Sequence, residues 1–368
     1  METKKFIDVL EIYNGKNQKA VENPDGKYPI YGSGGVMGRA DEYICPAETV
    51  VIGRKGSINN PIFVTEPFWN VDTAFGLVAR KEVVLPKYLF YFCRYFDFEK
   101  LNTTVTIPSL TKANLLKIEM PVPSIIEQNN IVTKLNLLTN MIQQCQEQLT
   151  KLDELVKARF VEMFGDPLHN TDNLPTSPMT SICQIIDGDR GKNYPKQEEF
   201  SDCGFCLFLN AKNVTAQGFS FENCMYITEQ KDALLHNGKL CRGDIVLTTR
   251  GTIGNLAFYD SSVPYENIRI NSGMVILRMN KDVVSEIFFI EQFKMQLNSI
   301  KDRIASGSAQ PQLPISMMNK IKMILPPIEL QNQFAAFVEE VDKSKVEVQK
   351  ALDQTQLLFD SLMQQYFG

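Results

Sequence analysis

The stretch Ile118-Glu-Met-Pro-Val-Pro-Ser-Ile-Ile-Glu-Gln128 decides how this chain is organised, because it returns as Ile321-Lys-Met-Ile-Leu-Pro-Pro-Ile-Glu-Leu-Gln331. The two copies are 203 residues apart. The same offset joins further pairs on either side, which are Leu110 with Leu313, Phe164 with Phe367 and Gly165 with Gly368. Solenoid repeats have periods of roughly 20–50 residues, so this repeat is too long to be one of them. The chain therefore carries two copies of a domain with its connector, and we expect approximate two-fold symmetry.

Length and composition favour a cytoplasmic protein with more than one domain. A chain of 368 residues has room for two or three hydrophobic cores. It has no apolar run of 18 residues, and its start lacks the apolar segment of a signal peptide, so we expect no membrane span. The eight cysteines are scattered, and we expect them to be reduced. Cys203 and Cys206 form the one close pair, which fits two cysteines near a turn better than a zinc site.

The negative charge of the chain lies in the two segments that follow the repeated stretch. Residues 124–164 and 327–368 together carry seven basic and twelve acidic side chains, and the difference of five is the whole net charge of −5. The remaining parts are neutral on balance, so each can still present a basic face. The net charge therefore permits a nucleic-acid partner without indicating one.

Residues 124–164 are expected to form one long helix. Ser124 and Glu127 have the spacing of a capping box, and Pro123 precedes them. The apolar positions that follow alternate in steps of four and three, as in a heptad seam. They are Ile131, Leu135, Leu138, Ile142, Cys145, Leu149, Leu152 and Val156.

A second helix is expected over residues 327–368, where the seam recurs with two polar interruptions, Lys345 and Thr355. About 40 residues at 1.5 Å each make a rod of roughly 60 Å. Such a rod could serve as an interdomain linker or pair with another copy of the chain. Two equivalent rods in one chain favour an antiparallel pair within it. Gly368 would then end beside Met1.

The resulting fold class is α/β, with two mixed α/β domains separated by a long antiparallel two-helix coiled-coil spacer. We expect domains at 1–122 and 166–326 and spacer helices at 123–165 and 327–368. Short β-rich runs are expected at 49–53, 75–79, 244–249 and 273–279, and amphipathic helices at 86–100 and 283–300.

Short polar motifs repeat more loosely between the two domains. The run Arg54-Lys55-Gly56-Ser57-Ile58 resembles Thr249-Arg250-Gly251-Thr252-Ile253 at offset 195. Gly15-Lys16-Asn17 matches Gly191-Lys192-Asn193 at offset 176, and residues 72–75 match residues 271–274 at offset 199. The drift in offset predicts loop insertions, the largest of them in the second copy between about residues 205 and 245.

These polar turns are the candidate DNA-contacting segments. Glycine lets backbone N–H groups face a phosphate, hydroxyls add donors, and arginine can bind a phosphate or guanine O6 and N7. The turns at 54–57 and 248–252 could instead be tight hairpins with a solvated arginine, but their recurrence in both domains favours the DNA-facing interpretation. The loops at 188–194 and 306–310 are further candidates. The candidate residues are Lys16, Asn17, Arg54, Lys55, Ser57, Arg190, Lys192, Asn193, Tyr194, Thr248, Thr249, Arg250, Thr252, Ser306, Ser308 and Gln310.

No motif for catalysis is present. The sequence lacks a G-x-S-x-G elbow, a P-loop and an H-E-x-x-H pair, and its two histidines lie in loop-like stretches. We therefore expect no catalytic residue and no metal or cofactor on this chain.

The order of domain, Pro-rich turn with Glu127-Gln128, long helix ending in Phe-Gly, and then the same again resembles the specificity subunit of type I restriction-modification systems. Val51-Ile-Gly-Arg-Lys-Gly56 and Pro67-Phe-Trp-Asn-Val-Asp-Thr73 also look like that family's recognition domains. At Leu330 the second copy departs from Glu127 of the first.

The resemblance implies that each recognition domain reads one half of a bipartite sequence in double-stranded DNA. It implies helices that set the gap and dock two methyltransferase subunits, which carry S-adenosylmethionine, and restriction endonuclease subunits that join the complex. It also implies that this chain has no active site. A non-catalytic protein-interaction scaffold, with two binding domains on a helical spacer, is the alternative that no motif excludes.

Overall fold

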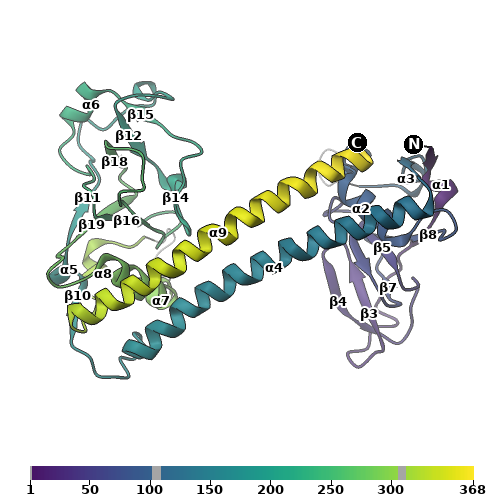
Figure 1. Ribbon diagram of the computed structural model, residues 1–368, viewed down its shortest axis with the longest axis horizontal. Helices are drawn as coiled ribbons and strands as arrows, with labels where there is room; N and C mark the ends of the chain where they lie inside the picture. Colours follow the sequence, from purple (N-terminus) through teal and green to yellow (C-terminus); the bar gives the residue numbers. More distant parts are fainter. Residues whose placement is uncertain (1, 102–108, 306–311) are drawn as a thin grey trace. The chain divides into compact units, whose positions relative to one another are not determined.

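The structure is a computed structural model that describes residues 2–101, 109–305 and 312–368. The chain divides into two compact units (Figure 1). The first unit contains residues 1–148 and 348–368, and the second contains residues 149–347. Each unit therefore includes parts of both long helices.

Each copy of the repeated stretch leads into a long helix, as expected from the sequence. Helix α4 spans Ile125–Phe164 and helix α9 spans Ile328–Phe367, with 40 residues each. The expected capping box is present at the start of α4. Ser124 N–H donates to Glu127 Oε2 at 3.1 Å, and Glu127 N–H donates to Ser124 Oγ at 3.3 Å. Gly165 ends α4 in the left-handed region with φ +69°, a common helix stop.

The two helices are antiparallel, because in each unit the beginning of one shares a core with the end of the other. In the first unit, Leu135 of α4 lies in the same hydrophobic core as Phe359 and Phe367 of α9. In the second unit, Phe160 of α4 contacts Phe334 of α9 with ring centroids 5.3 Å apart. The chain therefore forms the expected intramolecular pair.

The two polar interruptions of the second seam are accommodated differently. Lys345 Nζ pairs with Asp153 of the facing helix at 2.8 Å and with Asp342 of its own helix at 3.1 Å. Thr355 is buried, and its hydroxyl donates to Ala351 O at 2.7 Å. Neither side chain leaves its polar group without a partner.

The first unit is built on two small sheets. One is antiparallel in the order β2-β8-β5-β6, with β2 at Leu10–Asn14, β8 at Ala74–Ala79, β5 at Thr49–Gly53 and β6 at Ile62–Val64. The other has the order β4-β3-β7, with β4 at Gly35–Ala40, β3 at Tyr28–Gly32 and β7 at Trp69–Asn70. Strands β3 and β7 are parallel. Strand β1 at Thr3–Lys5 pairs with β9 at Glu119–Pro121.

The second unit repeats this plan. Its antiparallel sheet has the order β11-β19-β16-β17, with β11 at Cys183–Asp187, β19 at Met274–Met279, β16 at Asp244–Thr248 and β17 at Leu256–Phe258. The other sheet has the order β15-β12-β18, with β15 at Tyr226–Ile227, β12 at Cys206–Leu209 and β18 at Ile268–Ile270. Strands β12 and β18 are parallel. Strand β10 at Thr176–Pro178 pairs with β20 at Lys322–Ile324.

The insertion expected in the second copy is a hairpin and a short helix. Strands β13 at Val214–Thr215 and β14 at Gly218–Phe219 form the hairpin, and α6 spans Glu229–Leu234. The remaining short helices are α1 at Phe6–Val9, α3 at Lys112–Leu115, α5 at Met179–Ile182 and α8 at Ile315–Met318, with 3-10 turns at Phe98–Leu101, Gln197–Glu199 and Ala211–Asn213.

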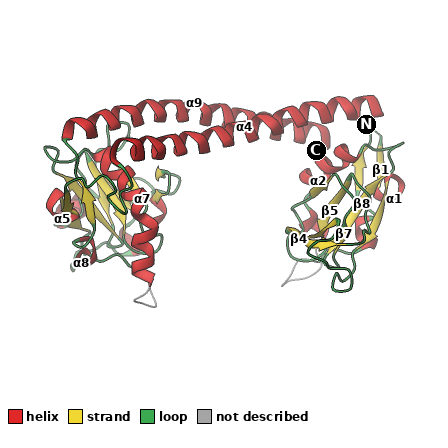
Figure 2. Ribbon diagram, turned by 90° about the horizontal axis from the view of Figure 1, so that it is seen from below, coloured by secondary structure: helices red, strands yellow, loops and turns green. Residues whose placement is uncertain are grey.

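In each unit one longer helix covers the antiparallel sheet. Helix α2 spans Pro86–Tyr95 and helix α7 spans Glu286–Ala305, so both amphipathic helices expected from the sequence are present. Figure 2 shows α2 beside the strands of the first unit and α7 beside those of the second. The residues of α2 share a core with strands β2, β5 and β8 and with both long helices, which makes the helix pair part of the domain core.

A buried glutamine joins each long helix to the helix that covers its sheet. Gln128 is fully buried, and its Oε1 accepts from Leu85 N–H at 2.8 Å while Nε2 donates to Val83 O and Pro123 O, both at 2.9 Å. Leu85 is the N-cap residue of α2, and Gln128 accepts from its backbone N–H, as the Glu or Gln at N3 does in a capping box. Gln331 makes the same three contacts, with Ser285 N–H, Val283 O and Pro326 O.

Strand register corrects two of the sequence matches. Asn14 pairs with Phe75 on β8, and Asp187 pairs with Val275 on β19. The counterpart of Asn14 is therefore Asp187, and that of Phe75 is Val275. The match of residues 15–17 with 191–193 is wrong by three residues, and the match of residues 72–75 with 271–274 is wrong by one. Identical letters in short loops outweighed the register that the strands impose.

Candidate nucleic-acid interface

In the first unit the candidate loops leave from one end of the antiparallel sheet. Strand β2 ends at Asn14 opposite Phe75, and β5 ends at Gly53 opposite Ala74, where β8 begins. The connections after β2 and β5 therefore leave from the same end of the sheet, on either side of β8. The first contains Lys16 and Asn17, and the second contains residues 54–57.

The second unit brings its candidate loops together in the same way. Strand β11 ends at Asp187 opposite Val275, and β16 ends at Thr248 opposite Met274, where β19 begins. The loop after β11 carries residues 190–194, and the loop after β16 carries residues 249–252. In the sequence these loops are two separate motifs, whereas in the structure both start at the same end of the sheet.

The loops after β5 and β16 have the same backbone geometry. In the first, the N–H groups of Arg54 and Lys55 both donate to Thr73 O, at 2.8 and 3.4 Å. In the second, those of Thr249 and Arg250 donate to Gly273 O, at 2.9 and 3.2 Å.

A glycine in the left-handed region follows in each loop, Gly56 with φ +78° and Gly251 with φ +73°. Such a φ favours glycine over residues with a Cβ. The expected offset of 195 is thus confirmed in three dimensions, and Lys55 is the counterpart of Arg250.

The two threonines that begin the second loop are buried, so their predicted role needs correction. Thr248 Oγ1 accepts from Asn255 N–H at 2.9 Å, and Thr249 Oγ1 donates to Gly273 O at 3.0 Å. Their side chains hold the loop in shape and are not available as surface donors. Arg250 and Thr252 are exposed, as are Arg54, Lys55 and Ser57 of the first unit.

The loop after β2 presents Lys16 and Asn17 on the surface. Lys16 is fixed through its backbone, because its O accepts from Trp69 Nε1 at 3.0 Å and its N–H donates to Asn70 O at 2.8 Å. Asn17 Oδ1 accepts from Lys19 N–H at 2.9 Å, which shapes the turn. The side chain of Lys16 extends from a fixed backbone, which suits a contact with a phosphate.

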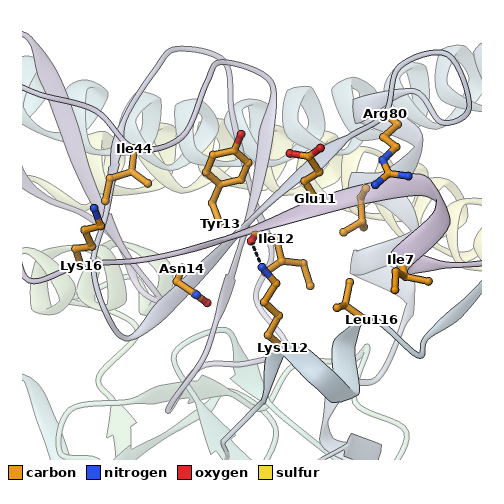
Figure 3. A pocket seen from close by; sticks show the side chains of 11 residues that line it. Ile7, Glu11, Ile12, Tyr13, Asn14, Lys16, Ile44, Arg80, Lys112 and Leu116 are labelled. Atoms are coloured by element: carbon orange, nitrogen blue, oxygen red, sulfur yellow. Dashed lines mark hydrogen bonds between the residues drawn. The ribbon is translucent and has the colours of Figure 1, made fainter.

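A hollow of about 540 Å³ runs along β2 beside this loop (Figure 3). Lys16, Arg80 and Lys112 line it together with Glu11. Lys112 Nζ donates to Ile12 O at 2.8 Å and so occupies a backbone acceptor of this edge strand. The basic side chains give the hollow a positive balance.

The loop after β11 contains both exposed and half-buried candidate residues. Arg190 and Lys192 are exposed, whereas Asn193 and Tyr194 are half-buried. Asn193 Nδ2 donates to Leu234 O at 3.1 Å, and the Tyr194 ring packs edge-on against Phe208 at 5.7 Å between centroids. The last two residues thus anchor the loop, and the first two face outward.

Asp189 organises this loop and was missed among the candidate residues. Its Oδ1 accepts from Gly191 N–H at 2.8 Å, and its Oδ2 accepts from the N–H groups of His236 at 2.8 Å and Asn237 at 3.4 Å. Burial opposes ionisation of this carboxyl, but the three N–H donors outweigh it and hold its pKa below the usual value. The signal in the sequence was an Asp two residues before a Gly, the spacing at which an Asp side chain accepts from a backbone N–H in an Asx turn.

Three of the candidate residues, Ser306, Ser308 and Gln310, lie outside the described residues, as does Met1, beside which the chain was expected to end. Within the described ranges, no three His, Cys, Asp or Glu side chains are grouped so that they could hold a metal ion. Cys206 is buried at the start of β12 and Cys203 is exposed in the preceding turn.

The family of the type I restriction modification DNA specificity domain matches residues 1–153 and 173–355, which is most of the chain. The chain belongs to this family. Members are non-catalytic DNA-specificity components that work with other restriction-modification subunits, so the expectations for family, fold class and general function are confirmed.

Two curated relatives of this specificity-domain chain match over nearly its whole length. A putative type I restriction enzyme specificity subunit from Haemophilus influenzae is 22% identical over 93% of this chain and 88% of its own length. A type I restriction enzyme specificity subunit from Methanocaldococcus jannaschii is 24% identical, with 94% and 88% covered.

A solved structure shows the same fold. The crystal structure of the type I restriction-modification S subunit from M. genitalium aligns with a TM-score of 0.66 at 18% identity, covering 100% of this chain and 96% of that one. Among the described residues, no helix is long and apolar enough to cross a membrane.

Proposed function

We propose that each unit reads one half of a bipartite DNA target through the loops at one end of its antiparallel sheet. The observation that carries this proposal is that equivalent exposed basic residues, Lys55 and Arg250, stand on loops of the same backbone geometry in two units. Structural duplication of an exposed loop suits a target with two similar halves, and DNA half-sites are such a target.

Within each interface we expect two kinds of contact, one that supplies affinity and one that reads the sequence. Exposed lysines and arginines at 16, 55, 192 and 250 would neutralise phosphates, which supplies affinity and makes binding sensitive to salt. A smaller number of side chains held in fixed orientations would read base edges in the major groove. The buried Thr248 and Thr249 would contribute by shaping their loop.

The long helices would set the gap between the half-sites and dock two methyltransferase subunits carrying S-adenosylmethionine. Leu155 and Leu358, which are related by the offset of 203, are 47% and 50% exposed. Two equivalent apolar side chains on solvent-facing helix positions offer one contact to each of two identical partners. Endonuclease subunits would join this assembly in the cytoplasm, where the DNA is.

A non-catalytic protein scaffold also fits two domains on a helical spacer, and DNA binding separates the alternatives. The full chain is purified with its methyltransferase subunits and incubated with a library of randomised duplexes, and the bound fraction is sequenced. We expect two short motifs separated by a constant gap, with affinity falling steeply as salt rises. Recovery of unenriched duplexes from a stable complex would favour the scaffold.

A further inference from the structure

The Arg190 side chain is exposed, but one side of its guanidinium group is hydrogen-bonded within the protein. Its Nη2 lies 3.0 Å from Asp187 Oδ2 and 3.1 Å from Asp187 Oδ1, and it donates to Ser272 O at 3.3 Å. The carboxylate is itself fixed, because its Oδ1 also accepts from Gly188 N–H at 2.9 Å. The ion pair therefore sets the direction of the arginine.

The outward side of Arg190 remains available to a ligand. Its side chain is 49% exposed, and among the described residues its Nε and Nη1 donate no hydrogen bond. These donors lie at the sheet end where β11 and β16 finish, beside the turn that leads into β19. An arginine fixed in this way has lost most of its rotamer freedom before it meets DNA, which lowers the entropy lost on binding.

The carboxylate also changes what Arg190 can contact. Asp187 compensates the positive charge, and its own charge repels phosphate oxygens. What remains is a set of directed N–H donors, for which the acceptors O6 and N7 of guanine are the best match among the base edges.

We propose that Arg190, positioned by Asp187, reads a guanine in the half-site bound by the second unit. This inference rests on the proposed function and assigns one base contact within it. Arg250 has no carboxylate at ion-pair distance among the described residues, so it contacts a phosphate instead.

The first unit has no equivalent of this Asp–Arg ion pair among its described residues. By strand register, its residues at the positions of Asp187 and Arg190 are Asn14 and Asn17. Asparagine pairs best with adenine N6 and N7. The two units therefore use the same loop position with different chemistry, and the guanine contact is confined to one half of the target.

The test repeats the randomised-duplex selection on the whole complex with three variants and measures the salt dependence of binding. Arg190→Lys keeps the charge and removes the planar group. Asp187→Asn removes the compensating charge, and Arg250→Ala is the matched control on the neighbouring loop. Melting temperatures of the three complexes show whether each variant remains folded.

We expect Arg190→Lys to reduce discrimination for guanine at one position of one half-site by about 5- to 150-fold, with the other half unchanged. Asp187→Asn weakens the same preference and steepens the slope of log affinity against log salt by about 0.9, because the charge of Arg190 is no longer compensated. A purely structural role of Asp187 would instead weaken all duplexes alike and leave the guanine preference unchanged. Arg250→Ala lowers the slope by about 0.9 and leaves the base preferences intact.

The inference is overturned if Arg190→Lys retains every base preference, or if Arg190→Ala, added for this purpose, weakens all duplexes equally and lowers the salt slope. An unchanged guanine preference in Asp187→Asn would overturn the positioning role. Failure of the unmodified complex to select any motif would instead contradict the proposed function itself, so the two failures are distinguishable.

Discussion

Replacing Gln128 by alanine should destabilise the first unit strongly, because this one fully buried side chain makes three hydrogen bonds. Without it, Leu85 N–H, Val83 O and Pro123 O lose their partner, and each of these hydrogen bonds is partly buried. A buried polar group left unsatisfied costs about 1–3 kcal/mol, and carbonyls keep a second lone pair, so we expect the free energy of unfolding to fall by about 3–5 kcal/mol.

The single tryptophan of the chain makes this effect measurable. Trp69 lies in the first unit and is 7% exposed, so urea unfolding followed by its fluorescence reports on that unit. With slopes typical of a domain of this size, the midpoint should fall by about 1–2 M urea.

The matched control is Gln143→Ala on the same helix. Gln143 is exposed, and its Nε2 donates only to Glu147 Oε1 one turn along, at 2.8 Å. Its loss should change the unfolding free energy by no more than about 0.5 kcal/mol. Equal midpoints for the two variants would refute the reasoning that Gln128 ties α4 to α2.

Three further outcomes are expected. Arg250→Ala should weaken binding at the half-site of the second unit alone, measured with duplexes that carry either half-site separately; an equal loss at both would contradict two independent readers. Deleting one heptad from both α4 and α9 should shorten the gap in the selected motif by about 3 base pairs, since seven residues rise about 10 Å; an unchanged gap would refute the spacer role. Asp189→Asn should be less stable than the unmodified protein at neutral pH, and acid titration of the unfolding free energy should show this difference shrinking below about pH 4, because a lowered pKa stabilises the fold above the usual value of 3.8 and that stabilisation is lost as the carboxylate is protonated. A difference that is constant with pH would exclude the ionised carboxylate as its cause.

The long helices were predictable because their signals are local and repeated. Ser124 and Glu127 form the capping box that their spacing indicates, and the seam from Ile131 to Val156 contributes to the cores as a heptad seam should. The sequence shows that Gln128 matches Gln331, but it does not show which groups these two side chains bind. Two of the three partners of each glutamine are more than 40 residues earlier in the chain, and no local pattern points to them.

The second, smaller sheet of each unit was beyond sequence reasoning for a physical reason. Strand β7 is two residues long and pairs in parallel with β3, so it has no periodicity to detect and no hairpin turn to mark it. The insertion in the second copy was foreseen only as extra length, without its hairpin or helix.

The sequence predicts the candidate site at the level of loops, and it does not predict how individual side chains are held. Hydroxyls after a strand suggested surface donors, yet Thr248 and Thr249 turn inward to satisfy loop backbone groups. The acidic residues of the loop after β11 were passed over because a DNA-binding surface is expected to be basic. In the structure, Asp187 pairs with an arginine of the candidate interface and Asp189 accepts from the loop backbone.

The most direct test of the central claim is to map methylated adenines across the genome of a host that expresses this chain with a type I methyltransferase subunit that co-purifies with it. We expect methylation at a bipartite motif with a fixed gap, present only when this chain is expressed and altered in one half when residues 1–122 are exchanged for another recognition domain. An intact complex that leaves the genome unmethylated, or methylates it without a two-part motif, would contradict the account.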